Sequence, residues 1–325
     1  MSQLSFSSLA YQSKKKFTRR ELFLAEMDQV TPWKLLEELI EPHYPRGEGG
    51  RPCMPLGVML RIYCMQQWFQ LSDPGMEDAL YDSHCMQRFA GLELGRDDIP
   101  DETTILKFRH LLEAHDLTSM MFETVRDFLE AKGIIVRHGT ITDATIIHAP
   151  SSTKNKDKAR DADMTSTKKG NQWYFGMKAH IGADSKSGLV HSLVCTTASV
   201  HDSQVADQLL HGDEEEIYGD KAYCDEKRRR HFLKQGVRWR VTIKPKRGTE
   251  LSERAKGWNK SRSRVRARVE HPFGVVKNQW GYRKVRYDGL AKNTCQLFSL
   301  FMLSNIYKAR RSLIRIQEWE RCRAT

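Results

Sequence analysis

The sequence predicts an α/β protein, with helices in its first part and a mixed β-sheet flanked by helices in the remainder. Two observations carry this prediction. Apolar side chains recur at helical spacing in residues 1–130, whereas β-branched residues gather in short runs from Gly133 onward. These strand-like runs then alternate with helical ones, as expected where helices cover a sheet. We therefore expect a helical N-terminal domain at 1–130 and a second domain at 131–325.

Three helices are expected most clearly in the first domain. One starts near Pro55, one spans 76–89, and one follows Asp101, whose carboxylate suits an N-cap. Short helices in series are typical of a helix-turn-helix-like, DNA-binding module. The polar face of the third helix is available to DNA, although an ordinary solvated face fits equally: it carries Thr104, Lys107 and His110.

The second domain is expected to follow the order β-β-β-α-β-α-β. We expect the strands at 139–147, 174–183, 189–197, 216–223 and 237–243. A helix near His201 and Asp202, a basic helix at 225–235 and an apolar closing helix in the last 35 or so residues complete the pattern. Within the polar stretch 151–170, the loop from Lys154 to Lys169 is expected to be mobile and to gain order on DNA.

The net charge is +12, with a pI of about 9.3, which favours an anionic partner such as nucleic acid. The basic residues are unevenly placed, because residues 221–286 contain 22 lysines and arginines and only five acids. This distribution resembles a binding face, although it also fits a solvated surface. The seven scattered cysteines indicate neither a disulfide framework nor a zinc site. With no apolar run long enough for a membrane, we expect a cytoplasmic chain.

Two aspartates stand at strand positions. Asp143 lies within the β-branched run Gly139–Ile147, where a carboxylate loses solvation and needs a partner or a cation. Asp220 follows the strand-like residues Ile217–Gly219. Either acid alone could cap a turn or form an ion pair. Both in one sheet can converge on a single site.

Glu270 is the only acid between Glu253 and Asp288. In a continuous helix, Arg266, Glu270 and Lys277 share one face, so an acid lies between two cations that suit phosphate. A simple exposed Arg-Glu pair fits the same spacing. Pro272 favours a kink or a helix start near 269–271, which would disturb the alignment of these three side chains.

These segments together resemble the DDE transposases of bacterial insertion sequences, specifically the IS-five family. The motifs are TDAT around Asp143, KKGNQWYFGMKAHIGAD from Lys168, YGDKAY around Asp220 and RARVEHPFGVVK from Arg266 to Lys277. The helical segment RPCMPLGVMLRIYCMQQWFQLSDPGMEDAL, residues 51–80, is similar to that family's N-terminal domain. In the wider signature Y-x2-R-x3-E-x6-K, Ser263 stands at the tyrosine position, which puts any role of that tyrosine in doubt.

The resemblance implies a ribonuclease H-like fold in which Asp143, Asp220 and Glu270 are catalytic and bind metal. Oxygen ligands favour Mg²⁺ or Mn²⁺, and two Mg²⁺ ions about 4 Å apart serve phosphodiester transfer. We expect water to free a 3′-OH at the element end, and this hydroxyl to attack target DNA. A bacterial, nucleoid-associated protein that binds double-stranded DNA and forms a homodimer on it follows from the family.

The remaining basic residues are expected to bind DNA. Arg266 and Lys277 steer the scissile phosphate. The wider surface, with Trp258, Trp280 and Tyr282 interleaved, holds the flanking DNA; its predicted phosphate contacts are Arg264, Arg268, Lys168 and Lys169. Three histidines, His180, His201 and His271, invite a metal or acid-base role, but the match is weak, and Asp202 is expected to cap the next helix.

Two other functions remain open at this stage. One is a ribonuclease H-like nuclease that cleaves nucleic acid without joining it. The other is a DNA-binding regulator that derives from a transposase and has lost catalysis. The intact acids argue against the regulator.

Overall fold

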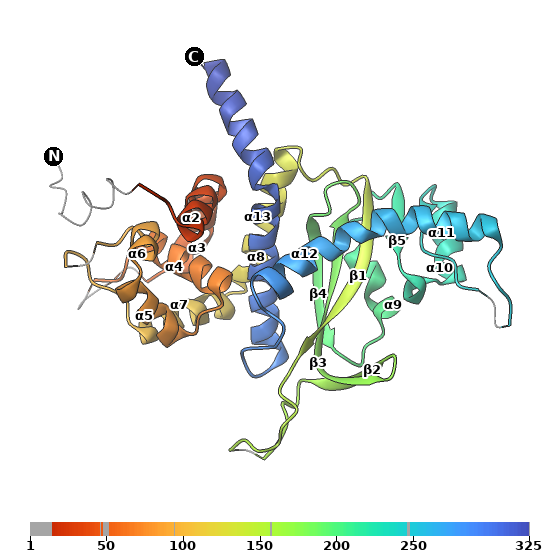
Figure 1. Ribbon diagram of the computed structural model, residues 1–325, viewed down its shortest axis with the longest axis horizontal. Coiled ribbons are helices and arrows are strands. Elements are labelled where there is room, and N and C mark those ends of the chain that lie inside the picture. Colours follow the sequence, from red (N-terminus) through yellow and green to blue (C-terminus); the bar gives the residue numbers. More distant parts are fainter. Residues whose placement is uncertain are drawn as a thin grey trace.

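The structure is a computed structural model that describes residues 15–45, 47, 52–93, 95–156, 158–245 and 248–324. A group of short helices occupies one end and a six-stranded mixed sheet the other (Figure 1). This arrangement confirms the α/β class. None of the helices in these ranges has both the length and the apolar character needed to cross a membrane.

The N-terminal helices are close to those expected. Asp101 caps α7, and its side chain accepts a hydrogen bond from the backbone N–H of Thr104. Pro55 is the N-cap of α4 rather than its first residue. The helix expected at 76–89 is two helices, because the chain turns at Ser83. The helices are α2 Arg19–Val30, α3 Trp33–Ile40, α4 Leu56–Phe69, α5 Asp73–Asp82, α6 His84–Ala90, α7 Glu102–Ala114 and α8 Leu117–Ala131, with a 3-10 turn at Glu41–His43.

The sheet has the strand order β2-β3-β1-β5-β6, and β4 pairs with β3 beside this path. β1 lies centrally, antiparallel to β3 and parallel to β5. The strands are β1 Gly139–His148, β2 Thr165–Lys169, β3 Gln172–Asp184, β4 Val190–Thr197, β5 Glu216–Gly219 and β6 Arg238–Trp239. α9 Asp202–Val205 and α10 Glu226–Lys234 lie between the later strands.

Two expectations for the strands were wrong. The stretch expected to be a mobile loop contains β2, which forms a hairpin with β3 through the pairs Lys169↔Gln172 to Thr165↔Gly176. The strand expected at 237–243 is reduced to two residues. Its following backbone instead bonds to the long helix, because Asn259 exchanges two hydrogen bonds with Ile243.

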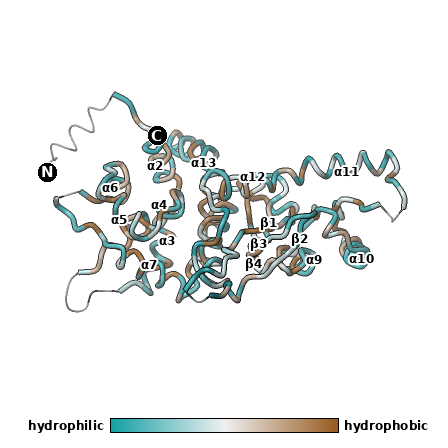
Figure 2. Tube along the Cα trace, turned by 60° about the horizontal axis from the view of Figure 1, so that its bottom comes forward, coloured by the Kyte–Doolittle hydropathy of each residue, from teal (hydrophilic) through white to brown (hydrophobic). Residues whose placement is uncertain are grey.

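Two long helical segments cross the sheet region. The first contains α11 Glu253–Arg266, a 3-10 turn Ala267–Val269, α12 Glu270–Gly274 and a π-helical turn Val275–Gln279. The second is the closing helix α13 Leu290–Ala324, which lies between the sheet and the N-terminal helices (Figure 1). Hydrophilic colours dominate α10 and α11, whereas hydrophobic segments mark the central strands (Figure 2).

α13 is joined to the sheet by a buried asparagine. The Asn305 side chain accepts from Val190 N at 2.9 Å and donates to Val190 O at 2.6 Å. It therefore satisfies both backbone groups of a residue at the start of β4, as a neighbouring strand would. One continuous cluster of buried apolar side chains joins the helical part to the sheet. Its members lie between Leu24 and Leu313 in the sequence and include residues of α8, β1 and α13.

We expect Asn305→Ala to lower the free energy of unfolding by about 2–4 kcal/mol, because it leaves two buried backbone groups of Val190 unpaired. Urea unfolding followed by circular dichroism measures this. Ser304→Ala is the matched control: Ser304 is equally buried and its hydroxyl has no partner within the described residues. Equal losses in the two variants would contradict the assigned role of Asn305.

Candidate active site

The two aspartates lie side by side because β1 and β5 are parallel. The last residue pair between β1 and β5 is Thr142↔Gly219, and Asp143 and Asp220 are the residues that follow this pair in the sequence. Gly219 permits the close approach, since a Cβ there would lie 3.1 Å from Thr142 Oγ1. The pairing of β1 with β5 thus brings together two acids that are 77 positions apart in the sequence.

Each aspartate is held by backbone. Asp143 Oδ1 accepts from its neighbour Ala144 N at 2.8 Å, and Asp143 Oδ2 lies 3.5 Å from Arg266 Nε. Asp220 caps the 3-10 turn Lys221–Tyr223, with Oδ1 accepting from Ala222 N at 2.8 Å. These contacts leave a carboxylate oxygen of Asp220 available for other partners.

Burial is the largest of the causes that raise the pKa of Asp143 to about 6. The nearby carboxylates of Asp220 and Glu270 contribute to this rise, while Arg266 and the Ala144 N–H oppose it. The Asp143 side chain is 15% exposed. Burial therefore outweighs the opposing charge of Arg266, and the two neighbouring carboxylates add to the cost of ionising Asp143.

Glu270 reaches this place on the helical segment that begins with α11. The backbone stays helical through Pro272, which is buried, and the segment tightens to a 3-10 turn just before Glu270. The loss of the Pro272 N–H is therefore absorbed without a break. Despite the mixed helix types, Arg266, Glu270 and Lys277 all face one cavity.

Lys277 joins this helical segment to β1. Its ammonium donates to Thr145 Oγ1 at 3.0 Å and to Ile146 O at 2.8 Å. Burial lowers its pKa, and the charges of Lys169 and Arg283 lower it further. Lys277 lies in the π-helical turn, a distortion that often marks functional sites.

The cavity has a volume of about 600 Å³ and contains side chains from both faces of β1. Its charged and ionisable lining includes four acids, five cations and one histidine: Asp143, Asp202, Asp220, Glu270, Lys168, Lys169, Lys178, Arg266, Lys277 and His201. Arg264 and Arg268, also expected to bind phosphate, do not line it. Arg268 instead donates to the Ser185 carbonyl at the β3–β4 turn.

Two of the three aromatic residues expected to contact DNA are buried. Trp280 and Tyr282 are 8% and 1% exposed, and both belong to the core. That part of the prediction was wrong, because position within a basic stretch does not reveal which side chains pack inward. Trp258 remains 48% exposed, with the Arg254 and Arg262 guanidinium groups 5.0 and 5.8 Å from its ring centre.

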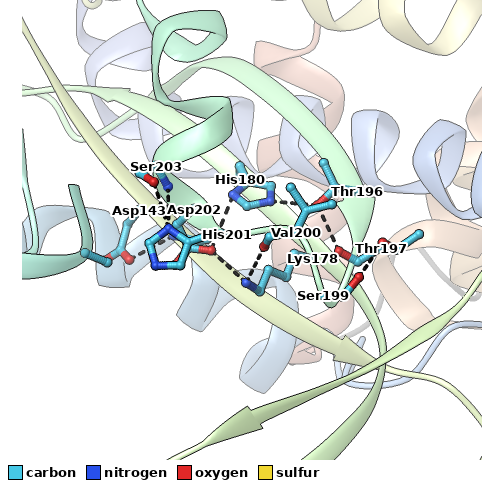
Figure 3. A network of polar contacts seen from close by, with 12 residues as sticks. Asp143, Lys178, His180, Thr196, Thr197, Ser199, Val200, His201, Asp202 and Ser203 are labelled. Atoms are coloured by element: carbon cyan, nitrogen blue, oxygen red, sulfur yellow. Dashed lines mark hydrogen bonds and ion pairs between the residues drawn. The ribbon is translucent and has the colours of Figure 1, made fainter. Parts of the chain in front are cut away.

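A charged network beside the acids was not expected (Figure 3). Lys178 on β3 donates to Asp202 Oδ1 at 2.9 Å and to Val200 O at 2.7 Å. His180, two residues along β3, is fully buried, and its Nδ1 lies 3.9 Å from the same oxygen. Burial lowers the pKa of His180 to about 4, which keeps it neutral near pH 7.

The expected helix at 201–202 exists, but its cap differs. His201 is the N-cap of α9, and its Nδ1 accepts from Ser203 N. Asp202 is the first helical residue and pairs with Lys178. In the sequence, Lys178 and His180 are two positions apart within an expected strand, so both are predicted to lie on one face of it. The sequence does not reveal that Asp202 contacts this face.

The donor set suits a hard divalent cation, because Asp143, Asp220 and Glu270 offer only carboxylate oxygens and their mutual repulsion is what such a cation relieves. Across the described ranges, no group of three His, Cys, Asp or Glu side chains is yet arranged to hold a metal ion.

A family model described as "Transposase DDE domain" matches residues 136–306, which is more than half of the chain. The chain belongs to this transposase family. A second model, "Transposase domain (DUF772)", matches residues 12–111 in the helical part. Among solved structures, a piggyBac transposase in a synaptic complex with hairpin DNA is similar, with a TM-score of 0.46, 10% identity, and coverage of 93% of this chain and 78% of that one.

The raised pKa of Asp143 predicts a pH-dependent stability. The folded protein binds one more proton than the unfolded chain between pH 3.8 and about 6, so stability falls as pH rises through this window. We expect Asp143→Asn to be more stable than wild type at pH 7 by about 1–3 kcal/mol, and equal to it near pH 4. Urea unfolding in a chelator tests this. Asp127→Asn, at an exposed position of α8, is the control. Parallel pH profiles of stability for wild type and Asp143→Asn would contradict the prediction.

The Lys178–Asp202 pair is expected to stabilise the cavity wall, since its side chains are only 12% and 26% exposed. Lys178→Met and Asp202→Ala should each cost about 1–3 kcal/mol, and the double variant less than their sum. The exposed pair Glu253–Lys256 provides the reference cycle, with a coupling below about 0.5 kcal/mol. Additive losses at Lys178 and Asp202 would show that the pair is energetically unimportant.

Proposed function

We propose that this protein is the transposase of a bacterial insertion sequence, of the IS-five type, that cleaves DNA at the element ends and joins the freed 3′-OH to target DNA. The observation that supports this most directly is the convergence of Asp143, Asp220 and Glu270 in one cavity lined by cations. The three residues come from a strand, a strand end and a helix, as in the ribonuclease H-like arrangement that the motifs imply.

In this proposal, Asp143, Asp220 and Glu270 hold two Mg²⁺ ions, or Mn²⁺. When bound, the metal activates the attacking oxygen and stabilises negative charge on the leaving oxygen. Asp143 is the carboxylate most in need of a cation, because it is largely buried and its pKa is raised by its acidic neighbours. Asp202 lines the same cavity, but its carboxylate is already paired with the Lys178 ammonium.

The cations of the cavity bind the DNA backbone. Arg266 lies beside Asp143 and suits the scissile phosphate, and Lys277 is held between helix and strand by two hydrogen bonds. Lys168 and Lys169 contact phosphates from the β2 side. Without these charges, DNA would be repelled by the clustered acids.

Flanking DNA binds outside the cavity. Arg264 and Arg268 are exposed on the helical segment that carries Glu270, and Trp258 with its two arginines lies further along α11. We assign recognition of the terminal inverted repeats to residues 1–130 and catalysis to residues 131–325. Since two element ends need two active sites, the protein acts as a homodimer on DNA.

The test uses purified protein and a plasmid carrying the reading frame with its flanking DNA. With Mg²⁺, wild type should cut at the element ends and yield joined products. Asp143→Ala, Asp220→Ala and Glu270→Gln should each lower the rate by about 100-fold or more, because bound metal contributes several kcal/mol to transition-state stabilisation. Glu253→Gln, on the same helical segment and outside the cavity, is the matched control.

The outcomes separate the competing functions. Cleavage without joined products would identify a nuclease and overturn the transposase proposal. Specific binding of element ends with no cleavage would identify a regulator. Acid variants that cleave as wild type does would overturn the assigned site. A Mg²⁺-dependent rise in the melting temperature of wild type that is lost in Asp143→Ala measures metal binding separately from activity.

A further inference from the structure

A cluster of cations lies beyond Asp143 along β1, toward the end of this strand at His148. His148 ends this strand, and its N–H donates to Arg283 O at 3.1 Å while its carbonyl accepts from Val285 N at 2.8 Å. The segment 283–285 is thereby fixed beside β1. Lys169 and Arg283 are close enough to Lys277 for their charges to interact with it. Lys277 and Lys284 are likewise close enough to His148.

These four cations are not neutralised by acids. Lys169 and Arg283 lower the pKa of Lys277 beyond the effect of burial, and Lys284 and Lys277 do the same to His148. Throughout the described part of the chain, none of Lys169, Lys277, Arg283 and Lys284 forms an ion pair. Arg283 is positioned by neutral groups, since it donates to Lys277 O and to Asn278 Oδ1. Such uncompensated repulsion is relieved by an anion with several charges, such as a run of phosphates.

The β2–β3 hairpin carries a tryptophan opposite Lys168, one of the lysines that line the cavity. Its tip is the two-residue turn Gly170–Asn171, where the positive φ of +63° at Gly170 suits the first position of such a hairpin turn. Lys168 pairs with Trp173 across the hairpin, so both side chains lie on the same face. Lys168 and Lys169 also line the cavity.

Trp173 is 68% exposed, and among the described residues its ring has no aromatic or cation–π contact. Trp319 is comparably exposed at 58%, but the Arg323 guanidinium covers its ring at 4.6 Å. An open aromatic face beside a lysine is a combination that binds single-stranded nucleic acid, through stacking on bases and contacts to phosphates.

We propose that the β2–β3 hairpin binds an unpaired stretch of DNA leaving the active site, with a base stacked on Trp173. Lys168 contacts the phosphate next to the stacked base. Lys169, Lys277, Arg283 and Lys284 bind the phosphates that follow toward the end of β1. The choice of DNA rests on the proposed function, but the binding itself needs neither metal nor catalysis. The hairpin would therefore recognise a frayed or cut end in preference to intact duplex.

The test measures binding of fluorescently labelled oligo(dT) to full-length protein by anisotropy, in a chelator. Trp173→Ala should weaken binding about 5- to 100-fold, the range found when one stacking aromatic is removed. Trp173→Phe keeps an aromatic face and should retain most of the affinity. Trp319→Ala is the matched control and should bind as wild type does. Wild-type affinity in Trp173→Ala would overturn the proposal.

Salt dependence tests the phosphate track separately. Arg283→Gln and Lys284→Gln should each reduce the slope of log affinity against log salt by about 0.7, as expected for one phosphate contact on a single strand. Unchanged slopes would remove these residues from the track. An equal loss of blunt-duplex and oligo(dT) binding in Trp173→Ala would show that no unpaired base is recognised.

The two proposals fail independently. If wild type never cuts or joins DNA but Trp173→Ala still loses oligo(dT) binding, the transposase function fails and the hairpin site stands. If wild type transposes and Trp173→Ala binds oligo(dT) normally, the hairpin inference alone fails.

Discussion

The parallel pairing of β1 with β5 is the constraint on which the candidate site depends. It places Asp143 and Asp220 at equivalent positions immediately beyond the pair Thr142↔Gly219. A slip of one residue in β1 would turn Asp143 to the opposite face of the sheet and separate the two acids. The register is supported on the other side by the long antiparallel pairing with β3. The Asn305 side chain adds a further constraint, since it joins α13 to β4, the outer neighbour of β3.

Much of this fold could be predicted because its signals are local. Asp101 has the side chain of an N-cap, and the apolar residues after it recur at helical spacing, so α7 was expected within a residue or two. The β-branched run around Asp143 predicted β1, and a carboxylate inside such a run marked a place that needs a counter-charge. Helical spacing also predicted that Glu270 and Arg266 share one face. This prediction agrees with the structure because the 3-10 turn between them still leaves both side chains lining one cavity.

The remainder depended on contacts between distant segments, which periodicity does not encode. β2 is polar and exposed, and it is a strand only because β3 offers it hydrogen-bond partners. Trp280 and Tyr282 lie in a basic stretch but belong to the core. The Lys178–Asp202 pair joins residues 24 positions apart, and neither residue alone signals the other. The charge pattern identified the basic region of the chain, but it did not show which side chains of that region face solvent.

In the proposed function, the uneven distribution of charge along β1 lets one strand serve both metal and DNA. The acids gather around Asp143 and the unpaired cations around His148, five residues further on. At about 3.3 Å per residue this is about 17 Å, the length of about five base pairs along one DNA strand. Clustered acids alone would repel a phosphate backbone, and clustered cations alone would repel a divalent metal ion. In the proposed function, acids in the middle of β1 and cations toward its His148 end each bind their own ligand. The hydrogen bond from Lys277 to the Ile146 carbonyl holds the helical segment against this strand.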